Sequence, residues 1–439
     1  MLNYQQFLDD LWFLRRDIVS DGYDQALEAI AKRLPLQIDR YRSGQEAWTW
    51  IIPPKWSVGE AWIRDGSRTL VDVRDHPLHV MSYSTPIAGR ISRAELLAHL
   101  HTRPDLPSAI PFEFSYYEPK WGFCVQHQRL DQFTAPEYEV LIEARHEPGE
   151  LKTGTLLAPG QSDDEILVMA HLCHPAMVND DLAGVAVLVA VAEKLLASGL
   201  RHRYSYRFLL MPETIGSIAF LSRHPQLIER IRYAVFLEML GNNQPLSLQL
   251  SRQGDSAIDK AARLALTSSG LDFRTGGFHE VIGNDEKVFN GPGVNIPSIS
   301  LSRSNFFGRG EWPYPEYHSS ADTPAIVTRE RLEEAEQVVL RTLQLMENAY
   351  TPVRKVRGPI FLSRYGLWVD WRADRDLNRK QSVVLESLEG EKDTLDIAAE
   401  LDLNIDVLTA WLDQFARHGL IEKRQGNRHS PRSHQAAGI

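Results

Sequence analysis

The stretch Ile166-Leu167-Val168-Met169-Ala170-His171, followed by Asn179-Asp180-Asp181-Leu182-Ala183-Gly184, decides the fold of this chain. A short apolar run that ends in a polar residue is typical of a buried β-strand. Aspartates ahead of a long apolar stretch over residues 182–198 are typical of a helix start, because carboxylates cap the free amide groups there. The two segments predict a strand and a helix of an α/β fold, with His171 at the carboxyl end of the strand.

The same alternation of strand and helix continues along residues 138–350. The apolar runs are 166–170, 206–211, 233–237 and 297–301, and the helical stretches are 182–198, 217–224, 256–269 and 328–349. Such alternation predicts a mostly parallel sheet with helices on both faces. Ligands of such sheets bind beyond the carboxyl ends of the strands. His171, Glu213 and Glu238 each follow an apolar run, so we expect them at this one edge.

Four further segments differ in pattern from this core. Residues 1–45 are predicted to be helical and to join residues 136–350 in one αβα domain. Residues 46–135 carry short β-rich runs between prolines and glycines, which predicts a small inserted β-rich domain. Residues 352–425 show three short helical patterns and a final strand, which predicts a winged helix-turn-helix domain. The polar tail at 426–439 is expected to be disordered.

The composition excludes several classes of protein. The 439 residues predict two or three domains, and the net charge of −10 gives no basic surplus for nucleic acid. Only two cysteines occur, which excludes a disulfide framework and fits a reducing compartment. The acidic N-terminus does not match a signal peptide, and no apolar run reaches the about 20 residues that span a bilayer. We therefore expect a cytoplasmic, soluble protein with no membrane partner.

The predicted winged helix carries the wrong charge for a DNA reader. Between Glu391 and Lys423 it holds eight acidic and three basic residues. Phosphate binding requires positive charge, so we expect no nucleic-acid partner. Protein contacts are the expected role, including a homo-oligomer formed through this domain or through the inserted one.

Acidic side chains at the predicted sheet edge suit a metal-dependent hydrolase. Asp180 can cap a helix, but nine residues after a strand-terminal histidine it can also face the same ion as His171. Glu238 ends a buried run, where an acid is costly unless it is paired or ligating, so a ligand role is favoured. Glu213 fits either an acid in the first turn of a helix or a general base. A zinc hydrolase needs such a free carboxylate beside its histidine and carboxylate ligands.

A late segment, Glu316-Tyr317-His318-Ser319-Ser320-Ala321-Asp322, adds a second histidine to this set. His318 is a candidate for the metal site because of these neighbours and because of the candidate site residues that precede it in the chain. Near it in the sequence, Arg303 and Tyr317 are candidates for holding a carboxylate or a ring of the substrate.

His174 and Cys173 follow His171 closely in the sequence and carry side chains that could take part in the chemistry. For His174, a structural or indirect role is favoured over ligation of a metal. Cys173 has no dedicated activating partner beyond His174, so a thiolate nucleophile is not expected.

The order of these residues resembles the M28-type zinc aminopeptidases. The matching positions are His171, Asn179-Asp180-Asp181-x-x-Gly184, Glu213-x-x-Gly216-Ser217, Glu238-Met239-x-Gly241, Asn284-Asp285 and Tyr317-His318-Ser319-Ser320-x-Asp322. A narrower resemblance is to the aminopeptidase-like proteins of polysaccharide gene clusters, the DUF4910/DUF2172 type. It rests on Leu172-Cys173-His174-Pro175-x-x-x-Asn179-Asp180, on Trp121-Gly122-Phe123-Cys124, and on Phe361-Leu362-Ser363-Arg364-Tyr365-Gly366-Leu367. The resemblance covers nearly the whole chain.

This resemblance implies a fold and a set of site residues. The fold is a phosphorylase/hydrolase-like αβα sandwich of the zinc-exopeptidase type, with a small inserted domain and a C-terminal winged helix. The resemblance implies that the metal ligands are His171, Asp180, Glu238 and His318. Asp180 would bridge the ions if two bind, and Glu213 would be the general base.

Two positions depart from the aminopeptidase pattern. Those enzymes have an aspartate two residues after the first histidine, where this chain has Cys173, and a second glutamate after the base, where this chain has Thr214. The missing carboxylate weakens the second metal site, so we expect one tightly held zinc, with any second ion weaker. The alternative is that Glu213 itself ligates, which leaves the base unassigned.

The predicted function is zinc-dependent hydrolysis of a peptide or related amide bond, in a short peptide or a small molecule. One alternative is an amidase or deacylase that acts on a sugar or a biosynthetic intermediate, because the same site serves both reactions. Another is a binding or regulatory protein with a degenerate metal site. Cys173 and Thr214 favour that last alternative, whereas the retained site residues disfavour it.

Overall fold

A computed structural model describes residues 2–425, and within that range the chain folds into two compact units. The first unit comprises Met1–Ser256 and Leu271–Leu340, and the second comprises Ala257–Gly270 and Arg341–Ile439. The tail predicted to be disordered, 426–439, lies outside the described residues. Over the described range, no helix combines the length and the apolar character needed to cross a membrane.

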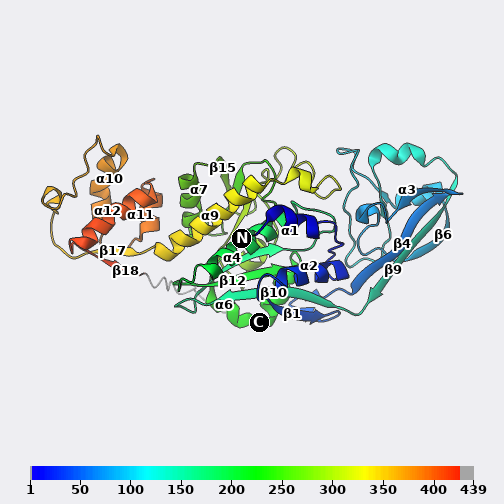
Figure 1. Cartoon of the computed structure of the whole chain (residues 1–439), viewed down its shortest axis with the longest axis horizontal. Coiled ribbons are helices and arrows are strands. Elements are labelled where there is room, and N and C mark those ends of the chain that lie inside the picture. The colour runs from blue at the N-terminus through cyan, green and yellow to red at the C-terminus, as the bar shows by residue number, and fades with distance from the viewer. Residues whose placement is uncertain (1, 426–439) are drawn as a thin grey trace. The chain divides into compact units, whose positions relative to one another are not determined.

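The first unit is built on a large mixed sheet (Figure 1). Within the described residues its eight strands have the order β1-β10-β12-β11-β13-β16-β14-β15. Their bounds are β1 (Gln37–Arg42), β10 (Glu150–Ala158), β11 (Glu165–His171), β12 (Ser205–Met211), β13 (Ile231–Leu237), β14 (Leu246–Gln249), β15 (Phe273–Gly276) and β16 (Ser298–Ser302). The four central strands β12, β11, β13 and β16 are parallel, as predicted. The sheet is mixed because β1, β10 and β12 pair antiparallel, and so do β14 and β16.

Helices cover the sheet and confirm the predicted α/β fold. Their bounds in the first unit are α1 (Tyr4–Leu11), α2 (Asp21–Ala31), α4 (Leu182–Ala197), α5 (Ile215–Arg223), α6 (Pro225–Arg230) and α8 (Glu286–Asn290), with the short 3-10 turn η3 (Pro324–Ile326). Leu167 and Met169 of β11 pack in one buried cluster with Phe220 of α5. Side chains alternate along a strand, so Ile166 and Val168 face the opposite side.

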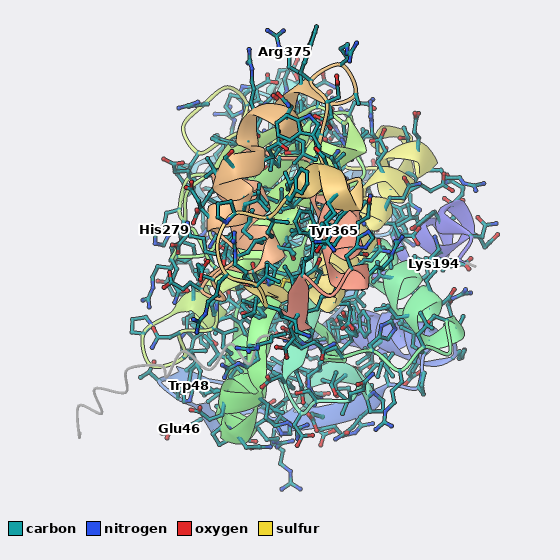
Figure 2. The ribbon with its side chains drawn as sticks, turned by 90° about the vertical axis from the view of Figure 1, so that its left-hand side faces the viewer. Glu46, Trp48, Lys194, His279, Tyr365 and Arg375 are labelled. Atoms are coloured by element: carbon teal, nitrogen blue, oxygen red, sulfur yellow. The ribbon has the colours of Figure 1, made fainter. Side chains whose placement is uncertain are left out.

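Helix α4 is buried from Leu182 to Ala192, which explains the apolar sequence of this part. It packs on β11, β12 and β13 and against α1. A helix enclosed on several sides is apolar around most of its circumference. Its last turn reaches the surface, where Lys194 is labelled in Figure 2. The helix therefore begins at the carboxyl edge of the sheet with its start held firmly by packing.

The prediction that residues 1–45 are helical is wrong for their last part. Helices α1 and α2 form as expected, but β1 is a strand that pairs with β10 from Gln37↔Thr155 to Arg42↔Glu150. Its residues are mostly polar, and Tyr41 is the buried exception. An edge strand needs few buried side chains, so it leaves little apolar signal in the sequence.

The inserted module is rich in β structure, as predicted. Its main sheet has the antiparallel order β5-β4-β9-β6 and lies at the right of Figure 1. The bounds are β2 (Glu46–Ala47), β3 (Trp50–Ile51), β4 (Lys55–Asp65), β5 (Arg68–Asp72), η1 (Pro77–His79), β6 (Ile87–Ser92), α3 (Arg93–Ala98), β7 (Leu100–His101), β8 (Phe123–Cys124), η2 (His127–Gln132) and β9 (Glu137–Glu147). Strand β9 extends the module past the expected boundary at residue 135.

The second unit is mainly helical. Its bounds are α7 (Ala257–Ser269), β17 (Thr351–Arg354), η4 (Leu362–Tyr365), α10 (Arg375–Glu386), α11 (Thr394–Glu400), α12 (Ile405–Arg417) and β18 (Ile421–Arg424). The boundary between the units falls within α9 (Arg329–Asn348). Strands β17 and β18 pair antiparallel, and α11 packs on α7 and α12. Helices and a strand form where the sequence predicted them, while the winged-helix assignment itself stays a prediction.

Candidate metal centre

The candidate site lies at the carboxyl edge of the central strands. Strand β11 ends at His171, and the chain then runs through residues 172–181 to the start of α4. The side chain of His171 is 1% exposed. Its Nε2 atom lies 3.4 Å from Oδ1 of Asp180 and 3.6 Å from Oδ2 of Asp181. The predicted pair of His171 and Asp180 therefore meets at this edge.

The two adjacent aspartates have different tasks. Asp181 caps α4, because its Oδ1 accepts the backbone N–H groups of Gly184 at 3.0 Å and Met239 at 2.9 Å. Asp180 points its carboxylate at imidazoles instead. The sequence offered both capping and ligation for this pair. In the structure Asp181 caps the helix through Oδ1 while its Oδ2 lies 3.6 Å from Nε2 of His171, and the carboxylate of Asp180 faces the imidazoles alone.

His318 comes from the last segment of the first unit in sequence, and it approaches the carboxylate of Asp180. Its Nε2 atom lies 3.2 Å from Oδ2 of Asp180. Its backbone carbonyl accepts the N–H of Phe112 from the inserted module at 2.8 Å, and the Phe112 ring packs edge-on against the imidazole. The late segment is thereby fixed against Asp180, although 138 positions separate His318 from it in the sequence.

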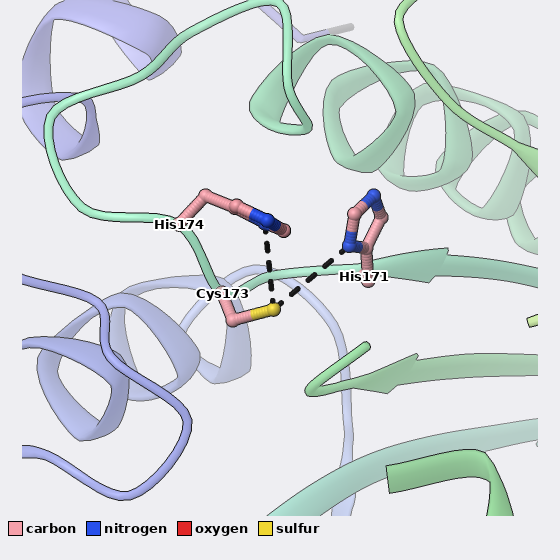
Figure 3. A group of neighbouring side chains, drawn as sticks. All are labelled: His171, Cys173 and His174. Atoms are coloured by element: carbon pink, nitrogen blue, oxygen red, sulfur yellow. Dashed lines mark hydrogen bonds between the residues drawn. The ribbon is translucent and has the colours of Figure 1, made fainter. Parts of the chain in front are cut away.

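Cys173 lies between two imidazoles, as Figure 3 shows. Its Sγ atom is 3.8 Å from Nδ1 of His171 and 3.5 Å from Nδ1 of His174. The backbone N–H of Glu213 also donates to this sulfur at 3.1 Å. Because the Nδ1 atoms face the sulfur, the Nε2 atoms of both rings are left to face Asp180 and Glu213.

Glu213 follows β12 and lies next to His174. Its Oε2 atom is 3.5 Å from Nε2 of His174, and its side chain is 30% exposed. Burial raises the pKa of Glu213 above its usual value, an effect that the nearby His174 partly offsets. A carboxyl group with a raised pKa that can still be reached from outside suits proton transfer.

Glu238 is fully buried at the end of β13, but its contacts are to other groups. Its carboxylate accepts hydrogen bonds from Asn284 at 2.6 Å and from Ser300 at 3.2 Å. Burial, followed by the charges of Glu286 and Asp181, raises its pKa well above the usual value. Among the described residues, the two groups with metal-ligand spacing do not include Glu238. Its predicted ligand role remains a prediction.

The two candidate substrate residues differ in their surroundings. Arg303 is buried, and its guanidinium donates to the carbonyls of Leu240 and Gln244 and to the carboxylate of Glu334. These contacts favour a structural role for Arg303. Tyr317 stacks on the His318 ring with centroids 3.9 Å apart, so it lines the site.

Arg16 and Asp322 hold the loop that carries the site, and sequence reasoning assigned no such role to Arg16. The buried guanidinium of Arg16 donates to the backbone carbonyls of Leu172 and Met177, as well as to two carbonyls of the N-terminal segment. The carboxylate of Asp322 accepts the backbone N–H groups of residues 178–180 at 3.2, 2.7 and 3.1 Å. A contact between an early arginine and a loop 156 residues away leaves no local signal in the sequence.

The backbone at the site is strained at several positions. Non-glycine residues with positive φ include His174 (85°), Thr214 (58°) and His318 (51°). Such conformations are uncommon for residues with a side chain, and they persist where surrounding contacts enforce them. The strain marks this edge of the sheet as a place where side-chain direction is tightly set.

Electrostatics keep His171 and Asp180 in forms that bind cations. Burial lowers the pKa of His171 to about 3, so its imidazole is neutral. Burial alone would raise the pKa of Asp180, but the imidazoles of His174, His318 and His171 outweigh it and the net shift is downward. Neutral imidazoles beside an ionised carboxylate are the protonation states that metal binding requires.

The unpaired atoms and the spacing of these residues are compatible with a zinc ion. Within residues 2–425, the buried atoms Nε2 of His171, Nε2 of His318 and Oδ2 of Asp180 have no hydrogen-bond partner. Buried polar atoms are rarely left unpaired, so such a set calls for an additional partner. Two ligands at about 2.1 Å from a tetrahedral ion are about 3.4 Å apart, and the imidazole–carboxylate distances here are 3.4 and 3.2 Å. Nitrogen and oxygen ligands of this kind suit zinc.

Comparisons with known proteins agree with this picture of the fold. The family described as a domain of unknown function, DUF4910, matches residues 5–349. A protein of Clostridium acetobutylicum, named as a polysaccharide biosynthesis protein with an aminopeptidase-like domain, is 33% identical over 345 residues, which are 78% of this chain and 77% of that protein.

Solved structures extend the comparison. A crystal structure from Clostridium acetobutylicum, described as that of a peptidase, has a TM-score of 0.83 at 29% identity and covers 96% of each chain. The zinc aminopeptidase BSAP of Bacillus subtilis has a TM-score of 0.58 at 15% identity, over 78% of this chain and 94% of that one. The latter likeness shows the fold alone. The chain therefore has an aminopeptidase-like fold and belongs to the DUF4910 family.

Proposed function

We propose that this chain is a zinc-dependent hydrolase of a peptide or related amide bond, with His171, Asp180 and His318 among the ligands of its metal centre. The observation that carries the proposal is the set of buried ligand atoms without hydrogen-bond partners among the described residues, gathered at the carboxyl edge of an aminopeptidase-like sheet. Glu238 is proposed as a further ligand that would have to turn from Asn284 toward the ion.

Glu213 is proposed as the general base. When bound, zinc would polarise the carbonyl of the scissile bond and lower the pKa of a water molecule. Glu213 accepts a proton from the attacking water, whose oxygen forms a bond to the carbonyl carbon. The carbon–nitrogen bond then breaks, and Glu213 returns the proton to the leaving nitrogen. Its partial exposure next to His174 supports this role.

A second substrate class has its own support. The relative in Clostridium acetobutylicum is named as a polysaccharide biosynthesis protein. An amide on a sugar or on a biosynthetic intermediate is therefore the alternative to a peptide, with the same residues in the same roles. A panel of aminoacyl amides and N-acyl sugars separates the two classes by which compounds are cleaved.

The substitution Glu213→Gln tests the base. We expect turnover to fall at least about 100-fold, since general-base catalysis contributes that much or more, while the bound zinc per chain stays the same. Glu60→Gln, an exposed residue of the inserted module, is the matched control and should leave turnover unchanged. Unchanged activity in Glu213→Gln would remove this residue from the base role. If the chain takes up no metal, the remaining interpretation is a non-catalytic binding or regulatory protein.

A further inference from the structure

Asp180 presents its two oxygens to different imidazoles. Oδ1 lies 3.4 Å from Nε2 of His171. Oδ2 lies 3.2 Å from Nε2 of His318 and 4.0 Å from Nε2 of His174. The nitrogen atoms near Asp180 therefore form two sets. Nε2 of His171 lies at Oδ1, and the Nε2 atoms of His318 and His174 lie at Oδ2.

The set at Oδ2 has the spacing of a complete metal site. The ligand atoms of His174, Asp180 and His318 all lie within 4.8 Å of one another. Asp180 is 2% exposed, and its Oδ2 atom has no hydrogen-bond partner in the described part of the chain. Three protein ligands that leave a fourth position open are the arrangement of catalytic zinc sites.

The loop fixes the direction of the His174 ring. Its Nδ1 atom faces Cys173, and its ring packs edge-on against Phe112, with centroids 5.4 Å apart. Its φ of 85° is held in place by a loop that Arg16 clamps on both sides, at Leu172 and Met177. A residue whose backbone is strained in order to aim one nitrogen at an unpaired carboxylate oxygen fits ligation better than packing.

An ion pair between His174 and Glu213 is the simpler explanation, since their atoms are 3.5 Å apart. It leaves Oδ2 of Asp180 and Nε2 of His318, which lie 3.2 Å apart, without a hydrogen bond to any further group among the described residues. The residue after Glu213 supplies no charge either, because Thr214 has a hydroxyl side chain and its N–H donates to Asp285. The group at Oδ2 thus holds one carboxylate, and imidazoles provide the remaining ligands.

We infer that His174 is a metal ligand of this chain, and that with His318 and Oδ2 of Asp180 it holds the second of the two ions that the resemblance allows at Asp180, beside the ion at His171. The inference rests on the proposed function, because the two sites share Asp180. Two imidazoles and one carboxylate favour zinc or cobalt over magnesium or calcium. The position of His174 compensates for the absent carboxylate at residue 214.

Metal stoichiometry of the full chain tests this assignment. The apo-protein is dialysed against zinc and the metal per chain is measured by elemental analysis. We expect two ions in the wild type and one in His174→Phe, which keeps an aromatic ring but removes both nitrogens. The affinity for the second ion should fall at least about 100-fold, more than loss of an indirect partner causes. The control is His99→Phe, an imidazole stacked on Trp121 in the inserted module, which should keep both ions.

Cobalt gives a second readout that does not depend on turnover. Two Co²⁺ ions bridged by one carboxylate are magnetically coupled, so the wild type should show a coupled electron paramagnetic resonance signal. His174→Phe should show the signal of a single uncoupled ion.

The outcomes separate this inference from the proposed function. One ion in both the wild type and His174→Phe would overturn the second site and leave the hydrolase intact. Two ions in both would show that His174 is not a ligand. No ion in the wild type would overturn the proposed function together with this inference.

Discussion

Cys173 is the residue whose chemistry is most easily misjudged from its neighbours. A thiol between two histidines resembles an activated nucleophile, yet burial raises the pKa of Cys173 well above its usual value, and the charge of Glu213 adds to the shift. The group is therefore a neutral thiol at physiological pH. Its contacts with both Nδ1 atoms make it a positioning residue for the two imidazoles.

A thiol titration checks this role. Cys124 and Cys173 are both free and buried, so the native chain should react with an aromatic disulfide reagent far more slowly than the unfolded chain does. Cys173→Ser should keep measurable hydrolysis, because the proposed mechanism uses water and forms no covalent intermediate on the sulfur. Rapid labelling of one thiol per native chain, with loss of all activity, would instead identify a nucleophile.

The pair Asp180 and Asp181 shows how much of a single residue's role can be predicted from the sequence. Its helix-start pattern correctly placed an aspartate at the cap of α4. It could not tell which carboxylate caps and which faces the imidazoles, because that depends on His318, a residue from a distant segment. The same limit applies to Arg303, whose nearness to His318 in sequence gave no information about its partners Leu240 and Glu334.

At the scale of elements, the site depends on the loop of residues 172–181 between β11 and α4. This loop carries two of the proposed ligands and is held by Arg16 and Asp322 through its backbone. The buried strands and helices that flank it were predictable, because their apolar runs are long and regular. The contacts of Arg16 with this loop were not predictable, since a buried arginine that donates to backbone carbonyls leaves no periodic pattern in the sequence.

Replacing Arg16 should lower the free energy of unfolding. Arg16→Met removes a buried guanidinium and leaves backbone carbonyls of Leu172 and Met177 without donors. We expect the free energy of unfolding to fall by roughly 2–4 kcal/mol, the usual cost of leaving buried acceptors unsatisfied. Urea denaturation followed by circular dichroism measures this loss.

The control for Arg16→Met is Arg90→Ala. Arg90 is an exposed arginine that pairs with Glu139 in the inserted module, and a surface pair of this kind should contribute little. Equal midpoints for Arg16→Met and the wild type would show that the guanidinium does not hold the loop.

The topology of the sheet is the part of the fold that the sequence predicted least well. Strand β1 is mostly polar, and it joins the sheet at an edge where only Tyr41 is buried. The antiparallel pairing of β14 with β16 depends on long-range register. Neither feature changes the apolar pattern along the chain, so a mostly parallel sheet was the natural expectation.

At the scale of the whole molecule, the proposed ion would link the site to the stability of the first unit. Ligands that bind only the folded chain stabilise it by mass action, about 2.7 kcal/mol at 100 times the dissociation constant. We expect chelation to lower the unfolding temperature and zinc to restore it. Scanning calorimetry of metal-free and zinc-loaded chain measures the shift, and identical transitions would argue against a structural link between ion and fold.

The charge of the molecule predicts no affinity for nucleic acid. The net charge is −10, and residues 391–423 are rich in acids. Charge repulsion should keep fluorescence anisotropy of a labelled DNA duplex unchanged up to micromolar protein, even at low salt where electrostatic binding is strongest. Binding that weakens steeply as salt is added would contradict this expectation.

The measurement that tests the central claim most directly is anomalous X-ray diffraction at the zinc absorption edge from crystals of the zinc-loaded chain. The predicted result is a peak about 2.0–2.2 Å from Nε2 of His171 or His318 and from an oxygen of Asp180. Zinc-loaded crystals with no peak at these atoms, or with peaks only at distant surface residues, would contradict the proposed metal centre.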